Sequence, residues 1–193
     1  MASFALPLAA CGGAATNPHA PGGGTTLPGV APTAAPAATA DACVSSGDAS
    51  EETFQVMRDE RLGPLRIGMA AEAVRSALGP PASSDGPAPD QVQGGFTWTW
   101  RYPERGVELS LWAETRSEPP SVGAIKLREG SSLRTRFGIG VGSSGAEVER
   151  AYRACWAPES TEEQRVAGSV YGGVVFTMKG NQVAELFVGA SAE

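Results

Sequence analysis

The chain has 193 residues, with 15 Lys and Arg against 21 Asp and Glu, a formal net charge of −6 and 7% aromatic residues. This length fits one folded domain with some unstructured chain, and it excludes two large domains. The acidic balance argues against nucleic acid as a partner, because affinity for phosphates comes from clustered Lys and Arg. Residues 1–40 contain no charged side chain. We therefore expect an uncharged tail joined near Asp41 to a folded domain.

The tail begins with a short apolar run that ends in small residues before Cys11. The run is too short to span a bilayer, which takes about 20 apolar residues, and it is typical of a signal-peptide core. No Lys or Arg precedes it, a departure from the usual pattern that a start upstream of Met1 would explain. Its end resembles the lipobox of bacterial lipoprotein signal peptides, matched here by Leu8, Ala9, Ala10 and Cys11.

The lipoprotein resemblance implies that residues 1–10 are removed and that Cys11 carries a thioether-linked diacylglycerol. Two or more acyl chains give stable anchoring, whereas one short chain does not. Gly12 follows the cysteine, in place of the Asp that retains such proteins in the inner membrane. The resemblance thus implies an anchor in the outer membrane, with the domain facing the periplasm or the cell surface.

Residues 11–42 form the predicted tether. They are rich in Gly, Ala, Pro and Thr and have too little apolar surface to fold. His19, the one histidine of the chain, lies among prolines in this segment. Nothing there would position its ring, so we expect neither a catalytic nor a metal-binding role for it.

Two cysteines remain in the folded part, Cys43 and Cys155. An even pair in an oxidising envelope compartment predicts a disulfide, and two buried thiols are the alternative. Closing a loop of about 110 residues would stabilise the domain by up to about 4 kcal/mol in the chain-entropy model.

The folded domain, residues 43–193, contains an internal repeat in which residues 65–78 align with 139–152 at an offset of 74. Each copy predicts a short strand, a glycine turn and a helix. Ser144 and Glu147 have the spacing of a helix capping box, whereas the first copy has alanines there. Apolar positions recur at i, i+3 and i+4 in both helices and predict one buried face each: Val74, Ala77 and Leu78, then Val148, Ala151 and Tyr152.

The remaining chain predicts strands between these helices. A loop is expected over 79–95, and another helix over about 51–61. Alternating apolar residues predict strands at 96–102, 107–113, 122–127, 170–178 and 183–188. Together they predict an α+β fold, in which two similar halves, about 51–130 and 131–193, form an antiparallel sheet with helices on one side.

One stretch resembles a known family through Ile67, Gly68, Met69, Val74, Leu78, Gly79 and Pro81. This pattern is similar to the opening of small envelope lipoproteins of the SmpA/OmlA (BamE) type, which pack a helical pair on a three-stranded sheet. A tandem copy of that unit also resembles the β-lactamase inhibitory protein and its relatives. The resemblance covers about residues 62–189 and implies no catalytic residue.

The chemistry available to the domain is narrow. Without a histidine it cannot form a Ser-His or Cys-His arrangement or a His-containing zinc site. Neighbouring carboxylates are expected on solvated faces: Glu51 and Glu52, Asp59 and Glu60, Glu162 and Glu163. The glycine-rich segment 138–142 is not followed by the Lys-Ser or Lys-Thr pair that a phosphate-binding loop requires. We expect no enzyme activity, no metal and no cofactor.

The aromatic residues are the candidate binding groups. The alternating Phe96, Trp98, Trp100 and Tyr102 are expected in the core, and Trp156 beside the disulfide. Trp112 falls out of phase with its apolar neighbours, on the side of Glu108. Exposed Trp with nearby Arg is typical of binding hot spots, so Trp112, Arg101 and Glu108 are the candidate site. A loop or the first helix covering Trp112 is the other interpretation.

These observations predict a membrane-anchored, non-catalytic module that binds an envelope protein or polymer through its sheet face. An inhibitor or small-ligand-binding lipoprotein on the same fold is the alternative. An exposed sheet with Trp112 and Arg101 favours a protein partner, whereas a closed apolar cavity favours a ligand.

Overall fold

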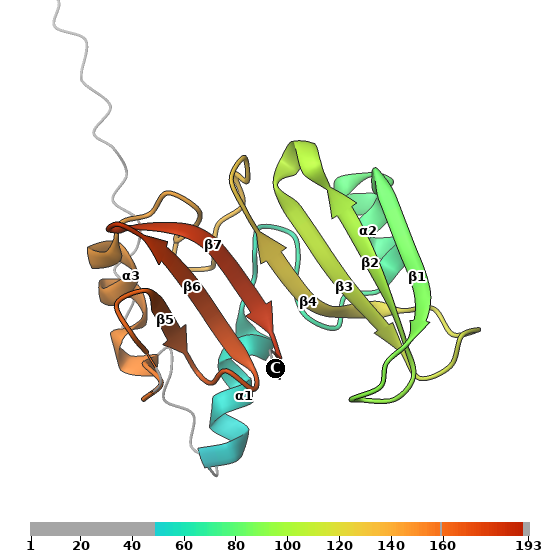
Figure 1. The fold of residues 1–193 in the computed structure, drawn as a ribbon, viewed down its shortest axis with the longest axis horizontal. Helices are drawn as coiled ribbons and strands as arrows, with labels where there is room; N and C mark the ends of the chain where they lie inside the picture. Colours follow the sequence, from blue (N-terminus) through green and yellow to red (C-terminus); the bar gives the residue numbers. More distant parts are fainter. Residues whose placement is uncertain (1–48, 159, 191–193) are drawn as a thin grey trace, which may run out of the picture. The chain divides into compact units, whose positions relative to one another are not determined.

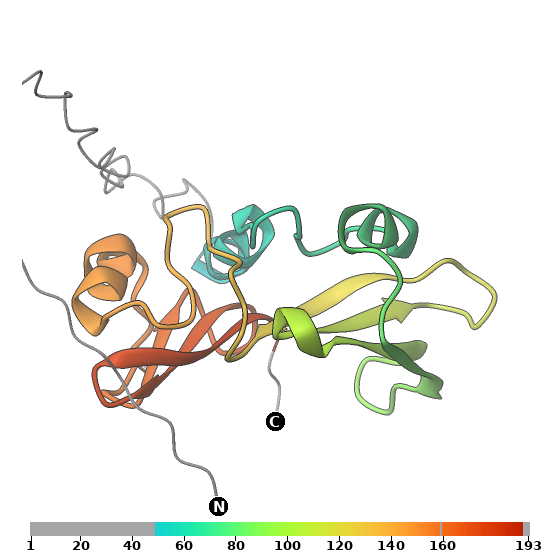
Figure 2. The same ribbon diagram turned by 90° about the horizontal axis from the view of Figure 1, so that it is seen from above.

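A seven-stranded antiparallel sheet forms the centre of the domain, and α-helices lie on one of its faces (Figures 1 and 2). The computed structural model describes residues 49–158 and 160–190, which belong to one compact unit of the chain. The predicted signal peptide, Cys11, the tether and Cys43 lie outside the described residues. No helix among the described residues is long and apolar enough to cross a membrane.

The elements alternate between helices and meandering strands along the chain. The α-helices are α1 (Ala49–Asp59), α2 (Ala71–Leu78) and α3 (Gly145–Tyr152), and the 3-10 turns are η2 (Pro103–Arg105) and η3 (Arg153–Cys155). The strands are β1 (Ser83–Pro89), β2 (Phe96–Tyr102), β3 (Val107–Ala113), β4 (Ser121–Leu127), β5 (Gln164–Ala167), β6 (Gly173–Lys179) and β7 (Gln182–Gly189).

The strand order is β1-β2-β3-β4-β7-β6-β5, so the last strand of each meander, β4 and β7, pair in the middle. Ile125 lies opposite Val188 in this antiparallel pair. The predicted α+β class and the antiparallel sheet with helices on one side are confirmed. Because β4 joins β7, the two meanders form one continuous sheet and share one core.

The predicted secondary structure differs from the observed one in three places. The expected loop over 79–95 contains β1, an edge strand with two prolines that forms only because it pairs with β2. The short strands expected before α2 and α3 are only isolated bridges, Ala70 to Ser121 and Ser144 to Gln182. β5 was not expected, because its four residues give too short a pattern.

The core lies between the helices and the sheet, and its side chains alternate along each strand. The predicted aromatic stripe points to this side: Trp100 and Tyr102 are buried, and Trp98 packs against the core. α2 buries Ala71, Val74 and Leu78 on the first half, and α3 buries Gly145, Val148 and Tyr152 on the second. The predicted helical faces are therefore confirmed except at Ala77, which is exposed.

α1 packs on the second half although it precedes the first. A Cβ on Gly172, just before β6, would lie 2.2 Å from the ring of Phe54, so only glycine admits this aromatic ring. Val56 of the same helix is buried in the core. The chain therefore crosses from the second half to the first between α1 and α2.

The backbone around α2 and α3 forms matching hydrogen bonds to the last strand of each meander. The first set is Gly68 N to Val122 O (2.7 Å), Val122 N to Met69 O (2.9 Å) and Ala71 N to Pro120 O (3.0 Å). The second is Gly142 N to Val183 O (2.8 Å), Val183 N to Ser143 O (2.9 Å) and Gly145 N to Asn181 O (3.0 Å). Each helix start is thus hydrogen-bonded to its own strand. The residues on the helix side of the two sets are 74 apart in the sequence, and their strand partners are 61 apart.

α3 begins with the predicted capping box. The Ser144 Oγ accepts a hydrogen bond from the Glu147 backbone N–H at 3.3 Å, and Glu147 Oε2 accepts one from the Ser144 N–H at 2.7 Å. α2 begins at Ala70, which makes no side-chain cap bond. The two helix starts thus provide a matched pair for measuring the contribution of the cap.

We expect Ser144→Ala to lower the free energy of unfolding by about 1 kcal/mol, the usual contribution of an N-cap side chain. Ala70→Ser, at the equivalent position of α2, should raise it by a similar or smaller amount. Urea unfolding monitored by circular dichroism measures both. Equal and negligible changes at the two positions would contradict this assignment of the cap.

A buried polar cluster fastens the chain after α1 to α3. Glu60 is 1% exposed, so its predicted position on a solvated face is wrong. Its carboxylate accepts hydrogen bonds from the Tyr152 hydroxyl at 2.7 Å and from the backbone N–H groups of Arg61 and Arg136, both at 2.9 Å. The Arg136 Nε lies 3.9 Å from Glu60 Oε2. Burial is tolerated because these partners replace the water that the carboxylate loses.

This cluster predicts a loss of stability at alkaline pH. Burial, and then repulsion by the Glu60 carboxylate, raise the pKa of Tyr152 well above its usual value near 10. Above pH 10 the unfolded chain therefore binds fewer protons than the folded one, and the free energy of unfolding falls as pH rises.

Urea unfolding between about pH 8 and about pH 11.5 measures this slope, which reaches at most about 1.4 kcal/mol per pH unit for one proton. Tyr152→Phe should be less stable than the parent at pH 8 and should lose this part of the slope. An unchanged alkaline slope in the variant would show that Tyr152 is not its source.

Candidate interaction surface

Among the described residues, the sheet face opposite the helices is largely uncovered over β2, β3, β4 and β7 (Figure 2). We call this surface the open face. Its side chains alternate with those of the core and are partly or fully exposed: Thr97, Thr99, Arg101, Glu108, Ser110, Trp112, Ala124, Lys126, Glu185 and Phe187. The cross-strand register decides which of these side chains become neighbours.

The register arranges the open face in rows that cross the strands. Arg101, Glu108, Lys126 and Phe187 lie directly opposite one another on successive strands and form a charged row that ends in an aromatic ring. The next row contains the short side chains Thr99, Ser110 and Ala124, and a third places Trp112 between Thr97 and Ser121. Large side chains therefore flank a row of small ones.

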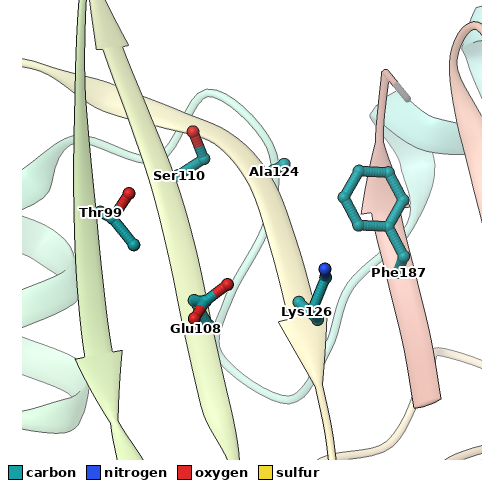
Figure 3. A pocket seen from close by; sticks show the side chains of 6 residues that line it. All are labelled: Thr99, Glu108, Ser110, Ala124, Lys126 and Phe187. Atoms are coloured by element: carbon teal, nitrogen blue, oxygen red, sulfur yellow. The ribbon is translucent and has the colours of Figure 1, made fainter. Parts of the chain in front are cut away.

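The row of small side chains leaves a shallow hollow of about 160 Å³, shown in Figure 3. It is lined by the short side chains of Ser110 and Ala124 and, in the neighbouring row, by Glu108, Lys126 and the ring of Phe187. Its volume is about half that of the smallest usual small-molecule pocket, about 300 Å³. The hollow is therefore suited to one protruding side chain rather than to a whole ligand.

The charges of the open face are paired across strands. Arg101 binds Asp85 of β1 and, through Nε at 3.2 Å, Glu108 of β3. The hydrogen bond to Asp85, despite some opposing desolvation, raises the pKa of Arg101. Exposed ion pairs add little stability, but they fix the direction of these side chains. Arg101 and Glu108, two of the predicted site residues, are thus brought together.

Glu185 of β7 forms a second charged group on this face. Its carboxylate lies 3.8 Å from Lys126 Nζ and accepts a hydrogen bond from Arg128 Nε at 2.9 Å. Positive and negative side chains therefore alternate across the open face. A partner with its own mixed charges would match this pattern better than one of a single sign.

Trp112 lies on the open face, as its phase along β3 predicts, and is half-buried. Its indole N–H donates to the Gly94 carbonyl at 2.8 Å, and a Cβ on Gly95 would lie 3.0 Å from the ring. The β1–β2 loop therefore holds the indole at the rim of the face and covers part of it. The sequence offered two interpretations of Trp112, a position on the exposed sheet face and cover by a loop. The structure contains both: the indole lies on the open face, and the β1–β2 loop covers part of it.

The open face ends near β5, where a second apolar cluster covers the sheet. Val166 and Val175 are buried there by Ala157, with Val170 and Phe187 at the margin. Ala157 belongs to the segment after α3. Its backbone N–H donates to the Val166 carbonyl at 2.9 Å. Phe187 is thus held on one side by this cluster and borders the hollow on the other.

Cys155 lies at the end of η3, is 8% exposed and is disulfide-bonded. Its partner lies outside the described residues, and the pairing with Cys43 stays a prediction. Trp156 is half-buried against the core rather than fully buried, with the Arg165 guanidinium 5.9 Å from its ring. Neither residue contributes to the open face.

Sequence reasoning missed Lys126, Glu185 and Phe187 as members of the surface. Alternation within the strand places Phe187 on the face opposite Leu186 and Val188, a signal that was present in the sequence. What brings Phe187 beside Lys126 is the β4–β7 pairing, which joins residues 61 positions apart. Within the described residues, no cluster of three or more His, Cys, Asp or Glu could hold a metal ion.

Comparison with known proteins finds no matching protein family, no similar curated protein and no similar solved structure.

Proposed function

We propose that this chain is a lipid-anchored protein of the bacterial envelope, facing the periplasm or the cell surface, that binds another protein non-catalytically through its open face. The observation that carries this proposal is the cross-strand surface of paired charges bounded by Trp112 and Phe187. Exposed aromatic residues and arginine are enriched at protein interfaces, where polar and charged side chains surround them. The lipobox-like Cys11 and the uncharged tether support the anchor.

The alternative, a small-ligand-binding lipoprotein, is less favoured because the hollow on the open face is small and polar-rimmed. An inhibitor would use the same surface as a binding module and differ only in its partner.

We also propose that the domain consists of two similar repeats. The sequence offset of 74 and the matching hydrogen bonds at both helix starts support that arrangement.

The anchor is tested by expressing the full-length gene beside a Cys11→Ser variant and measuring intact mass and membrane partitioning. We expect the parent protein to begin at Cys11, to carry acyl mass and to sediment with the outer membrane, because a thioether diacylglycerol holds it there. The variant should be unmodified and soluble. A parent protein that keeps Met1 and stays soluble would contradict the lipoprotein assignment.

The surface is tested by placing a photo-crosslinking amino acid at Ser110 on the open face or at Ala73 on the exposed side of α2. We expect a discrete crosslinked product from Ser110 alone, lost at least tenfold when Trp112→Ala or Lys126→Ala is added, since both side chains border the contact. Equal crosslinking from Ala73 would show that the partner does not use the open face.

A further inference from the structure

Five arginines gather on two segments that run side by side in the helix layer. One segment begins in the last turn of α1, and the other precedes α3. We call these residues the arginine patch: Arg58, Arg61, Arg66, Arg134 and Arg136. They form a third of the 15 basic side chains, in a chain whose net charge is −6.

A tight turn after α1 directs two of the arginines outward. Leu62 and Leu65 exchange backbone hydrogen bonds of 3.0 and 3.1 Å, and both side chains are fully buried. Arg61 and Arg66 flank this pair on either side and are exposed. Because neighbouring residues of an extended strand point to opposite sides, burial of the leucines brings the two guanidinium groups to the surface.

The second segment lies directly against this turn. The Gly63 N–H donates to the Arg134 carbonyl at 2.9 Å, and Glu60 Oε1 joins the backbone N–H groups of Arg61 and Arg136. Thr135 is 5% exposed, so its neighbours Arg134 and Arg136 are directed outward. The two segments are therefore held together by a backbone hydrogen bond and by the buried Glu60 carboxylate.

Few carboxylates neutralise the patch. Glu60 is buried beneath it, and the exposed Asp59 accepts a hydrogen bond from Gln55 at 2.9 Å. The side chains of Arg58, Arg61 and Arg66 make no hydrogen bond or ion pair with any residue that the structure describes. Their charges are therefore available to an outside anion.

The two remaining arginines have partners within the domain, and Arg136 Nε lies 3.9 Å from the buried Glu60 Oε2. Arg134 Nη1 donates to the Ser143 hydroxyl at 2.9 Å, and its charge also lowers the pKa of Glu147, after larger contributions from Ser144 and Arg150. The Arg136 guanidinium lies 4.7 Å from the ring of the half-buried Phe137. Arginines beside partly exposed apolar groups are suited to the headgroup region of a membrane.

The patch and the open face lie on opposite sides of the sheet (Figure 2). Both segments run on the side of the helices, and α1, which carries Arg58, is the first described helix after the predicted tether. An anionic surface bound on the helix side would leave the open face free for a partner. Without such a contact, a tether of the composition predicted for residues 11–42 would give the domain no fixed orientation.

We propose that the arginine patch binds the phosphate groups of anionic phospholipids and so holds the domain against the membrane with its open face outward. This inference rests on the proposed lipid anchor in one respect: the anchor is the reason for choosing a membrane as the anionic surface. Each exposed Arg close to such a surface adds attraction that falls off within a Debye length.

The test uses the full chain with Cys11→Ser, so that no acyl chain contributes, and vesicles with and without phosphatidylglycerol in phosphatidylcholine. We expect sedimentation with the phosphatidylglycerol vesicles alone, lost near 1 M salt, where the Debye length is about 3 Å. The variant Arg58→Gln, Arg61→Gln and Arg66→Gln should bind about a hundredfold more weakly. None of these three side chains makes a hydrogen bond or ion pair with a described residue, so we expect the fold to be unaffected.

A matched control removes the same number of charges elsewhere, with Arg105→Gln, Arg116→Gln and Lys179→Gln. All three residues are exposed, the first two on connections between strands and Lys179 at the end of β6. It should keep at least one third of the parent binding. Equal losses in both variants, binding to pure phosphatidylcholine, or binding to soluble polyphosphate with no binding to the phosphatidylglycerol vesicles would each overturn the proposal. Failure here would leave the acylation result for Cys11 unchanged, so the two proposals fail separately.

Discussion

Glu60→Ala is expected to lower the free energy of unfolding by about 3 to 5 kcal/mol, enough to unfold a marginal domain. The change removes the acceptor for the Tyr152 hydroxyl and for two backbone N–H groups, and it leaves the Arg136 guanidinium without its buried counter-charge. Unpaired buried donors retain their desolvation cost. Equilibrium urea unfolding at pH 7 measures the loss.

The neighbouring Asp59→Asn is the matched control, because Asp59 is exposed at the end of α1 and has one hydrogen-bond partner, Gln55. It should change stability by no more than about 0.5 kcal/mol. Glu60→Gln keeps the shape and one acceptor oxygen and should fall between the two. A Glu60→Ala protein as stable as the Asp59→Asn protein would show that the buried cluster does not hold α1 and α3 together.

Phe176→Ala is the second change with a large effect, expected to cost about 3 to 5 kcal/mol. Phe176 is fully buried on the helix side of β6, its ring centroid lies 5.0 Å from that of Tyr152, and its neighbour across the strands is Leu186. Truncation leaves a cavity between rigid neighbours that cannot close around it. Thermal and urea unfolding measure the loss.

Phe187→Ala is the comparison, since Phe187 lies on the opposite face of the same sheet and is only partly buried. We expect a cost of about 1 kcal/mol, because fewer of its contacts lie in the interior. This variant should weaken the crosslink from Ser110, whereas Phe176→Ala should affect only stability. Equal destabilisation by the two changes would contradict the assignment of an uncovered face.

Local features of the sequence predicted the helices and most of the strands. The spacing of Ser144 and Glu147 predicted the capping box, and alternation in 96–102 and 107–113 placed Trp100 inward and Trp112 outward, because a strand directs successive side chains to opposite faces. The α+β class followed from these elements. Each of these predictions depends on contacts within a few residues of the chain.

The sequence failed where distant pairing decides the structure. Ser83–Pro89 has the composition of a loop and becomes a strand only beside β2. Glu60 looks like one of two solvated carboxylates, yet packing against α3, 92 residues away, buries it beneath Tyr152. Neither outcome has a local signal, because both depend on which surfaces meet.

By itself, the sequence determined the uncharged tail with its lipobox-like cysteine, the absence of histidine from the domain and the alternation that separates the two sheet faces. Tertiary structure alone decided the β4–β7 pairing, which places Phe187 beside Lys126 and creates the hollow of the open face. It also brought residues 58–66 against 134–136 and so gathered the arginine patch. Local sequence patterns specify which way a side chain faces within a helix or strand. Which elements lie next to one another is decided only when the whole core is buried.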